Sequence, residues 1–506
     1  MILLRLGIFG ALTPCAMLLA ITASLAGEDA KSLLKESAVQ GGLIVHLDSD
    51  HAAETASLLL NERYLVQGLN RDADAVKEMR RQLLESDRYG DVSIYQYDGR
   101  CLPYADNLVN AIIATEDMTV PMEEIMRVLA PRGKLLLNDR TVTKPWPDAI
   151  DEWNHYLHGP NNNAVAQDRV VGAPRSIQWV AKPRWGRSHE EMASMSATVT
   201  AQGRVFFIVD EAPLESIRYT GDWKLVAHDA FNGVLLWKRE IPQWIDHLRH
   251  FRSGPAHLSR RLVAVGDVVY VTLGLAAPIV AIDAATGETI RTYQETEYAE
   301  EILVDNGILY LVVGSSEVNR TGGGLFLRGE PEPTDFRHVM AIEAATGRHL
   351  WKMESKADEF VLPLSLTIQG EDVVFQNTAG LICVDAASGD EKWRVDRPTP
   401  AKRMGFSAPT VVISDGVLLC ADRDAETDTT STGVAWGSTD GLCRASLGKG
   451  NRRSSPIRLP MEKCSGPPPA ARVTTRRSTC SSSTGPFGSV PTSPDMTSRP
   501  ARRTPP

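Results

Sequence analysis

The chain has 506 residues, which is too long for one ordinary hydrophobic core and predicts two or three domains. Hydrophobic residues make up 43% and charged residues 23%, as in soluble globular proteins, and the net charge of −9 argues against a general nucleic-acid binder. The charge is uneven, because residues 441–506 carry ten Arg and two Lys against two acidic residues. This last segment is therefore expected to be separate from the folded domains.

The first 26 residues have the features of a secretory signal peptide. Arg5 precedes an apolar run over residues 6–25, and Ser24 and Ala26 are small residues spaced as in a cleavage site. An uncleaved membrane anchor is the alternative, since the run is close to spanning length. In both cases the sequence predicts a periplasmic or secreted protein that contacts a membrane only through this segment.

Short apolar strands alternate with helical segments in the next part of the chain, which we assign to one domain over residues 30–145. Strands that alternate with helices at this spacing imply a mostly parallel, doubly wound α/β sheet. Strands are expected over residues 42–47, 64–69, 92–97, 111–114 and 134–137, and helices over 52–61, 72–85 and 122–129, with Asp72 or Asp74 near the start of the second helix.

Two passages in this domain have a family-like wording. Asp98 is followed by LPYADNLVNAII over residues 102–113, and EIMRVLAPRGKLL covers residues 124–136. Both passages resemble those of class I S-adenosylmethionine-dependent methyltransferases over about 100 residues. The resemblance implies the methyltransferase fold, with a cofactor site at the carboxyl ends of the first strands.

The residues that the resemblance places in this cofactor site are Asp48, Asp50, Asn70 and Asp98. Where the family has a glycine-rich loop that leaves backbone amides available, this chain has DSDHA over residues 48–52, which brings carboxylates toward the carboxylate of the cofactor. Asn70 replaces the acid that usually binds the ribose, and Asp98 keeps the place that contacts the adenine. We therefore predict a degenerate site that disfavours S-adenosylmethionine and contains no catalytic residue.

Histidines suggest an alternative, metal-binding reading at two places. His46 and His51 lie close in sequence to the two acids of the loop. His155 and His158 would share one face of a helix in the connector that we assign to residues 146–185. The favoured interpretation of the connector, which also holds Trp146, Trp153 and Trp179, is an aromatic wedge that packs the two domains together. No metal site is predicted.

A repeat governs the segment that we assign to residues 186–425. Each unit has an apolar strand and then a hairpin with an acid at the end of one strand, a Gly at the turn and usually a Trp on the return strand. The Trp is expected to pack between neighbouring units. The four hairpins are AHDAFNGVLLW over residues 227–237, AIDAATGETIR over 281–291, AIEAATGRHLW over 341–351 and CVDAASGDEKW over 383–393.

This wording resembles the PQQ-like repeat family, whose units are four-stranded blades of a β-propeller. The resemblance implies about four blades and the first strands of a fifth, which is an incomplete propeller. The quinoprotein dehydrogenases of that family use adjacent cysteines, and the seven cysteines of this chain include no adjacent pair. Pyrroloquinoline quinone is therefore not expected as a cofactor.

The strand pattern ends after Cys420, and Pro, Ser, Thr and Arg dominate afterwards. Such a composition cannot bury a core, so residues 426–506 are expected to be a disordered basic tail, and the abrupt change suggests a shift of reading frame. The leading functional hypothesis is an exported, non-catalytic binding or scaffold protein whose propeller face holds a protein or a small-molecule ligand. The alternatives are an active methyltransferase and a quinone-dependent oxidoreductase.

Overall fold

The structure is a computed structural model. It describes two residues of the expected tail. These two, Ile457–Arg458, form strand β27, so the expectation of complete disorder over residues 426–506 is wrong at this point: the backbone of β27 pairs with an edge that β26 would otherwise leave open. The expected signal peptide and the rest of the tail lie outside the described residues. These are residues 30–138, 140–174, 176–184, 186, 194–216, 219–244, 256–316, 331–332, 335–401, 403–404, 408–422 and 457–458.

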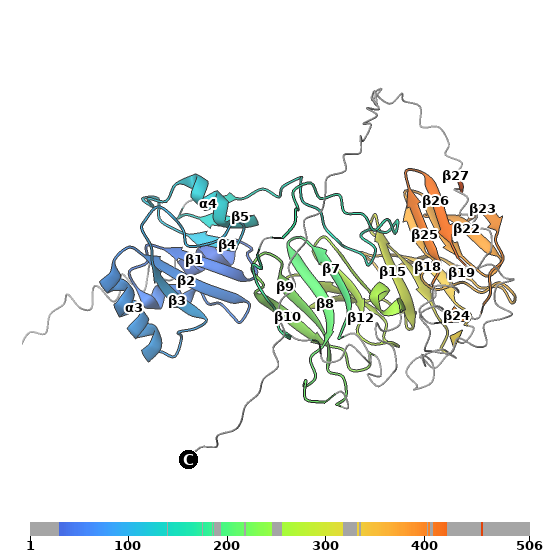
Figure 1. Cartoon of the computed structure of the whole chain (residues 1–506), viewed down its shortest axis with the longest axis horizontal. Helices are drawn as coiled ribbons and strands as arrows, with labels where there is room; N and C mark the ends of the chain where they lie inside the picture. Colours follow the sequence, from blue (N-terminus) through green and yellow to red (C-terminus); the bar gives the residue numbers. More distant parts are fainter. Residues whose placement is uncertain are drawn as a thin grey trace, which may run out of the picture. The chain divides into compact units, whose positions relative to one another are not determined.

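The first domain is built on one six-stranded sheet with the order β3-β2-β1-β4-β5-β6 (Figure 1). Strands β1 to β5 are parallel, as predicted, and the added strand β6 is antiparallel to β5. The chain leaves β1 in one direction toward β2 and later returns to β4 on its other side, so the carboxyl end of β1 is a topological switch point. The strands are β1 (Gly42–Leu47), β2 (Tyr64–Asn70), β3 (Val92–Gln96), β4 (Val109–Ile113), β5 (Leu129–Leu136) and β6 (Thr141–Thr143).

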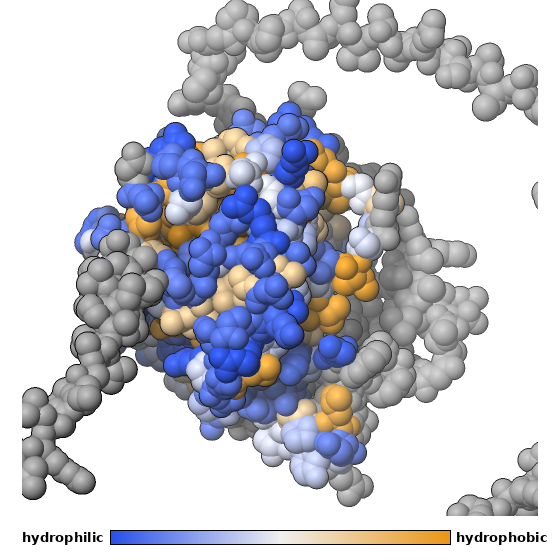
Figure 2. All heavy atoms as spheres, turned by 90° about the vertical axis from the view of Figure 1, so that its left-hand side faces the viewer, coloured by the Kyte–Doolittle hydropathy of each residue, from blue (hydrophilic) through white to orange (hydrophobic). Residues whose placement is uncertain are grey.

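Both faces of this sheet are covered, which explains why β1 is buried at all six positions. Its side chains alternate between two apolar clusters, with Ile44 in one and Val45 in the other. The Asp72 side chain accepts hydrogen bonds from the backbone N–H groups of Asp74 and Ala75, which confirms the expected helix start. The helices are α2 (Ala52–Ser57), α3 (Ala73–Glu85) and α4 (Met122–Val128). Figure 2 turns the left-hand side of Figure 1 to the viewer, and the residues on this face are mainly hydrophilic.

The repeats form consecutive antiparallel sheets of the propeller-blade type (Figure 1). Four of them have four strands each, and the fifth has three strands among the described residues. The first two sheets are β7 (Met195–Ala201), β8 (Arg204–Asp210), β9 (Trp223–Asp229), β10 (Leu235–Glu240), and β11 (Leu262–Val265), β12 (Val268–Thr272), β13 (Ile279–Asp283), β14 (Thr289–Thr292), with the 3-10 helix η1 (Ala256–Arg261) before β11.

The remaining sheets follow the same plan. A two-stranded pair, β17 (Pro331–Glu332) with β24 (Arg403–Met404), lies outside it. The sheets are β15 (Ala299–Asp305), β16 (Ile308–Val313), β18 (His338–Glu343), β19 (His349–Glu354); then β20 (Thr367–Gln369), β21 (Asp372–Gln376), β22 (Gly380–Asp385), β23 (Glu391–Asp396); and β25 (Thr410–Ser414), β26 (Val417–Ala421) with β27.

The hairpin chemistry expected from the repeat is present in the structure. In the second sheet, Asp283 Oδ1 accepts hydrogen bonds from the backbone N–H groups of Ala285 and Thr286. Gly287 follows with φ +77°, a left-handed conformation that a residue with a Cβ adopts only at a cost. The equivalent glycines of the other three hairpins have φ between +74° and +80°. The acid and the glycine therefore define the same turn in each sheet.

An aromatic side chain fastens each of these hairpins to the preceding part of the chain. The indole of Trp237, on the last strand of the first sheet, packs on Gly287 and donates to the Ala284 carbonyl oxygen at 3.0 Å. Trp351 makes the equivalent bond to Ala386 at 2.9 Å. The expectation that Trp packs between neighbouring units is therefore confirmed at both residues.

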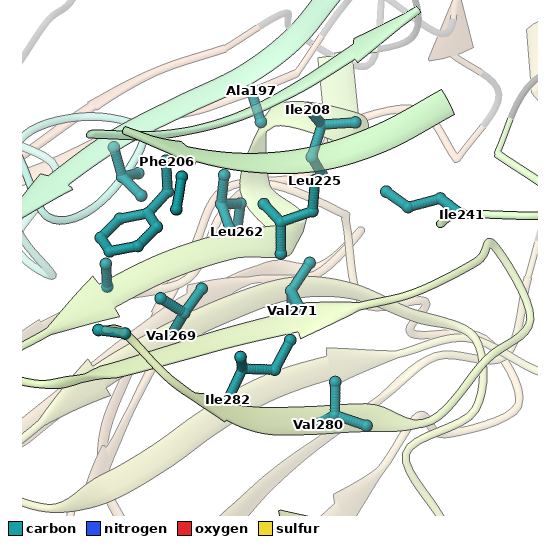
Figure 3. Packing of buried hydrophobic residues seen from close by; sticks show 14 of the residues in the cluster. Ala197, Phe206, Ile208, Leu225, Ile241, Leu262, Val269, Val271, Val280 and Ile282 are labelled. Atoms are coloured by element: carbon teal, nitrogen blue, oxygen red, sulfur yellow. The ribbon is translucent and has the colours of Figure 1, made fainter. Parts of the chain in front are cut away.

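The second sheet has Arg291 in the place of the Trp and solves the same problem with two residues. Arg291 donates to the carbonyl oxygens of Ala345 and Thr346, and Tyr293 Oη donates to Ala344 at 2.7 Å. Among the described residues, four apolar clusters each join side chains of two consecutive sheets. Figure 3 shows the one between the first two sheets, where Phe206, Ile208 and Leu225 face Val269, Val271 and Ile282.

The first hairpin also binds the α/β sheet, and both belong to one compact unit, Met1–Leu459. Asn110 Nδ2 on β4 donates to Asp229 Oδ2 at 2.7 Å, and Asn232 Nδ2 donates to the Leu108 carbonyl oxygen at 2.9 Å. Asn110 Oδ1 accepts from the backbone N–H of Leu43 at 2.8 Å. These contacts lie at the amino ends of β1 and β4, so the hairpin binds the edge opposite the expected cofactor site.

We predict that Trp237→Ala destabilises the propeller by about 3–5 kcal/mol, because it removes a large buried side chain and leaves the Ala284 carbonyl oxygen without its donor. Denaturant unfolding followed by circular dichroism measures the loss. The matched control is Leu235→Ala on the same strand, since Leu235 is 39% exposed. An equal effect of the two substitutions would contradict the docking role of the indole.

Candidate functional site

The four residues expected at the cofactor site lie after the carboxyl ends of β1, β2 and β3. Asp48 and Asp50 follow β1, Asn70 ends β2, and Asp98 comes two residues after β3. The structure brings the first three together around the end of β1, and it places Asp98 on a separate turn beyond Tyr97. Each of the four has hydrogen-bond partners within the chain, which defines the chemistry of this edge.

Asp48 is held by two side chains, Arg71 directly after the end of β2 and Tyr97 directly after the end of β3. Its Oδ1 accepts a hydrogen bond from Arg71 Nε at 3.0 Å and another from Tyr97 Oη at 3.0 Å. Asp48 also has φ +53°, so it adopts the left-handed conformation that a glycine would take without strain. Burial, together with the Asp48 carboxylate, raises the pKa of Tyr97, so the phenol stays protonated and remains a donor.

Asn70 closes the loop after β1 instead of facing outward. Its Nδ2 donates to the Ser49 carbonyl oxygen at 2.8 Å and to Asp50 Oδ1 at 3.0 Å, while its Oδ1 accepts from the backbone N–H of Asp72 at 2.7 Å. Asn70 is only 5% exposed. The amide thus uses its donors and its acceptor to join the end of β2 to the loop and to the start of α3.

Asp98 stabilises its own turn. Its Oδ1 accepts from the backbone N–H groups of Arg100 and Cys101 at 2.8 and 2.7 Å. These backbone bonds lower the pKa of Asp98, and the bond from Cys101 contributes most. The residue is therefore a carboxylate at neutral pH. The side chain has the same local role as the acid of an Asx turn.

The residues at this edge do not fit S-adenosylmethionine. A carboxylate at Asp48 replaces the small residue whose backbone amide would bind the cofactor's own carboxylate, and like charges repel at short range. The Asn70 amide, which would have to bind ribose hydroxyls, is instead bonded to Ser49 and Asp50.

Arg71 and Tyr97 are the residues that sequence reasoning missed. Arg71 directly follows Asn70 and Tyr97 directly precedes Asp98, so both lie next to positions that the resemblance had singled out. A cation and a phenol at those places are natural partners for an acid at the end of the adjacent strand. Their places directly after the carboxyl ends of two strands of the same parallel sheet were the available signal.

Of the two histidines near this loop, His46 lies in the core and His51 is exposed. His46 is buried on β1, and its Nδ1 hydrogen bonds with Thr55 Oγ1 at 3.1 Å, while Thr55 donates to Ser49 Oγ at 2.9 Å. Burial lowers the pKa of His46 to about 4. Within the part of the chain that the structure describes, no group of three or more His, Cys, Asp or Glu side chains is arranged to hold a metal ion.

The connector precedes the propeller in the chain and lies against its sheets. Its histidines are not on a helix. His155 and His158 pair as an isolated antiparallel bridge. Trp146 contacts Phe231 edge to face, and Trp179 stacks on His228 and donates to the Ala230 carbonyl oxygen at 2.9 Å. These two rings therefore pack on the first propeller hairpin, which itself binds the α/β sheet, and the wedge between the domains stays an interpretation.

A pocket of about 510 Å³ lies where the connector meets the third and fourth sheets. His158 Nε2 and Asp151 Oδ2 lie 2.7 Å apart in it. Burial raises the pKa of Glu152 and of Asp305. Acids and one imidazole are thus the ionisable groups of the pocket. Its full lining consists of Trp146, Ile150, Asp151, Glu152, Asn154, His158, Gly159, Pro160, Asn161, Asp305, Ile368, Gln369 and Gly370.

We predict that the chain loses stability as the pH falls from about 6.5 to 4, in part through His46. In this interval the unfolded state binds a proton that the folded state, with its buried imidazole, does not, so the contribution of His46 is present above pH 6.5 and is lost toward pH 4. The loss amounts to roughly 3 kcal/mol for a shift of this size.

Urea unfolding at several pH values measures this slope. His46→Gln is expected to flatten it, because glutamine does not titrate. His349→Gln, in which the replaced ring is exposed on β19, is the control and should keep the slope. An unchanged slope in His46→Gln would mean that the imidazole is protonated in the folded state.

Comparisons with known proteins give one family match and several similar solved structures. The family model described as outer membrane protein assembly factor BamB matches residues 313–439. No curated protein sequence matches the chain significantly. Among the described residues, no helix is both long and apolar enough to cross a membrane.

Solved structures of two kinds are similar to the chain. Quinohemoprotein alcohol dehydrogenase from Comamonas testosteroni is 14% identical, with a TM-score of 0.35, and the match covers 53% of this chain and 46% of that one. A putative S-adenosylmethionine-dependent methyltransferase from Methanococcus maripaludis is 16% identical, with a TM-score of 0.21, over 23% of this chain and 55% of that one. The chain thus spans about half the length of the solved structures that it matches.

Proposed function

We propose that the chain is an exported, non-catalytic binding or scaffold protein that combines a PQQ-like propeller with a degenerate methyltransferase-like domain. The observation that carries this proposal is the self-bonded edge of the α/β sheet, where Asp48 binds Arg71 and Tyr97, and Asn70 binds the loop after β1. A working cofactor site presents its donors and acceptors to the ligand. Here the side chains bond to one another.

Calorimetry of the full chain with S-adenosylmethionine tests the proposal. The wild-type protein is expected to show no binding tighter than about 100 μM, which corresponds to about −5.5 kcal/mol. A variant that restores the family pattern, Asp48→Gly with Asp50→Gly and Asn70→Asp, is expected to bind more tightly, because it removes the repelling carboxylates and supplies the acid.

The control for this experiment is Asp87→Gly, since Asp87 has a similar positive φ, +54°, in an exposed turn of the same domain. It should leave the affinity unchanged. Binding tighter than about 100 μM by the wild-type protein would overturn the proposal and favour the alternative of an active methyltransferase.

We place the ligand of the propeller in the pocket between the connector and the third and fourth sheets. The carboxylates of Asp151, Glu152 and Asp305 favour a cationic group there, and Trp146 supplies an aromatic ring that suits the same charge. Burial already raises the pKa values of Glu152 and Asp305, so a bound cation would stabilise their charged forms. The ligand is thus proposed to be a small organic cation or a basic side chain of a protein.

Spermidine is a suitable probe for this site at low ionic strength. We predict that Asp305→Asn weakens its binding roughly two- to fivefold, the effect of one partly exposed charge. Asp415→Asn, in the corresponding turn of the fifth sheet, is the control and should have no effect. Equal affinities in the two variants, or no binding by the wild-type protein, would exclude the pocket as a site for cations.

A further inference from the structure

The first strand of each of the five propeller sheets donates a hydrogen bond to the connector, and we call the edge that this strand forms the inner edge of the sheet. In each sheet the first strand along the chain is an edge strand, namely β7, β11, β15, β20 or β25. An edge strand presents backbone N–H groups that its own sheet does not bind. In this protein the connector binds one such group in every sheet.

The bonds follow the order of the sheets along the chain. The carbonyl oxygens of Trp153 and Asn154 accept from the first and second sheets, and His155 Nε2 accepts from the third. The carbonyl oxygens of Pro160 and Asn161 accept from the fourth and fifth. The donors are the backbone N–H groups of Thr200 at 2.7 Å, Ala264 at 3.0 Å, Val304 at 3.0 Å, Ile368 at 2.9 Å and Ile413 at 3.0 Å.

All five donors occupy the same position of the repeat. Each lies four residues before the first residue of the next strand in its sheet, as Thr200 does before Arg204 and Ile413 does before Val417. A chance contact of a linker with the propeller would not select one equivalent N–H group in each of five sheets. The connector therefore binds the equivalent backbone N–H group of each repeat.

A buried polar cluster anchors the end of this segment. Asn162 is 3% exposed, and its Nδ2 donates to the carbonyl oxygens of Leu366 and Val411, in the fourth and fifth sheets. Its Oδ1 accepts from Arg260 Nη1, which also donates to Glu301 Oε1 at 2.7 Å. One amide thus joins groups from before the second sheet, and from the fourth and fifth.

His155 provides the link in the middle. It is 2% exposed and accepts from Val304 through Nε2, so in its neutral form Nδ1 carries the proton and donates to Asn154 Oδ1 at 2.6 Å. Burial, with a smaller contribution from Arg260, lowers the pKa of His155 to about 3, in agreement with a neutral ring. An acceptor of this kind is what an edge N–H group requires.

We propose that residues 153–162 are a strap, a built-in extended ligand that binds one N–H group at the inner edge of each sheet and fixes the spacing of the sheets. One N–H group at each of these edges is therefore already bound within the chain. The strap also carries His158, and Asp151 and Glu152 directly precede it, so it positions the pocket described above. This inference does not depend on the proposed function.

Hydrogen–deuterium exchange of the full-length protein, read by mass spectrometry on peptides that cover the five donor residues, tests the strap. Asn162→Gly removes the three hydrogen bonds of the amide and keeps the backbone conformation, since Asn162 has φ +59°. It is expected to speed exchange at Ile368 and Ile413 about tenfold or more, and to leave β1 and β2 of the α/β sheet unchanged. Ala164→Gly, just beyond the strap, is the control and should change neither.

A second pair of variants isolates a single bond and decides the question if Asn162→Gly fails to fold. His155→Leu removes the acceptor of Val304 at a similar volume, whereas His155→Gln keeps an acceptor. Faster exchange at Val304 in the leucine variant than in the glutamine variant supports the strap. Equal exchange at Val304 in both variants and in the wild-type protein would overturn it, because the segment would then be a linker that lies on the propeller without holding it.

Discussion

The docking of an aromatic side chain on the next hairpin is the interaction on which the propeller depends. A glycine with positive φ brings the hairpin backbone close enough for an indole to lie flat on it, and the indole N–H then reaches a carbonyl oxygen of the turn. Packing and hydrogen bonding thus act at the same contact. Because the turn is built by an acid and a glycine that lie within four residues of each other, the interaction can be copied from sheet to sheet.

The connector contacts the propeller at two places, the first hairpin and the inner edges of the sheets. Trp179 docks on Gly233 of the first hairpin and donates to Ala230, as Trp237 does to Ala284 in the next one. At the inner edges, residues 153–162 bind the repeat-equivalent N–H groups. A segment between two domains therefore supplies both the outer contact of the first sheet and an acceptor for the inner strand of every sheet.

In the α/β domain, the architecture and the loop after β1 depend on different interactions. The strand order, the two apolar clusters and the cap at Asp72 depend on burial and local turn chemistry, which the loop residues Asp48 and Asp50 do not disturb. At the edge itself, the acids found partners in Arg71 and Asn70. The opposite edge binds the propeller through Asn110, and Asn232 takes part where the other hairpins have Thr or Ser.

The sequence by itself determined the two folds, the turn chemistry of the hairpins and the edge of the α/β sheet at which Asp48, Asp50 and Asn70 meet. These features depend on residues that are close together in the chain, such as Asp283 with Thr286, or on the alternation of apolar residues in β1. Only the tertiary structure decided that Tyr97 and Arg71 bind Asp48, that Tyr293 shares the role of a missing Trp, and that the connector binds all five inner edges. The physical reason is that the donors of the strap are backbone N–H groups, which every residue except proline has, so no side-chain pattern marks which of them a distant segment will bind.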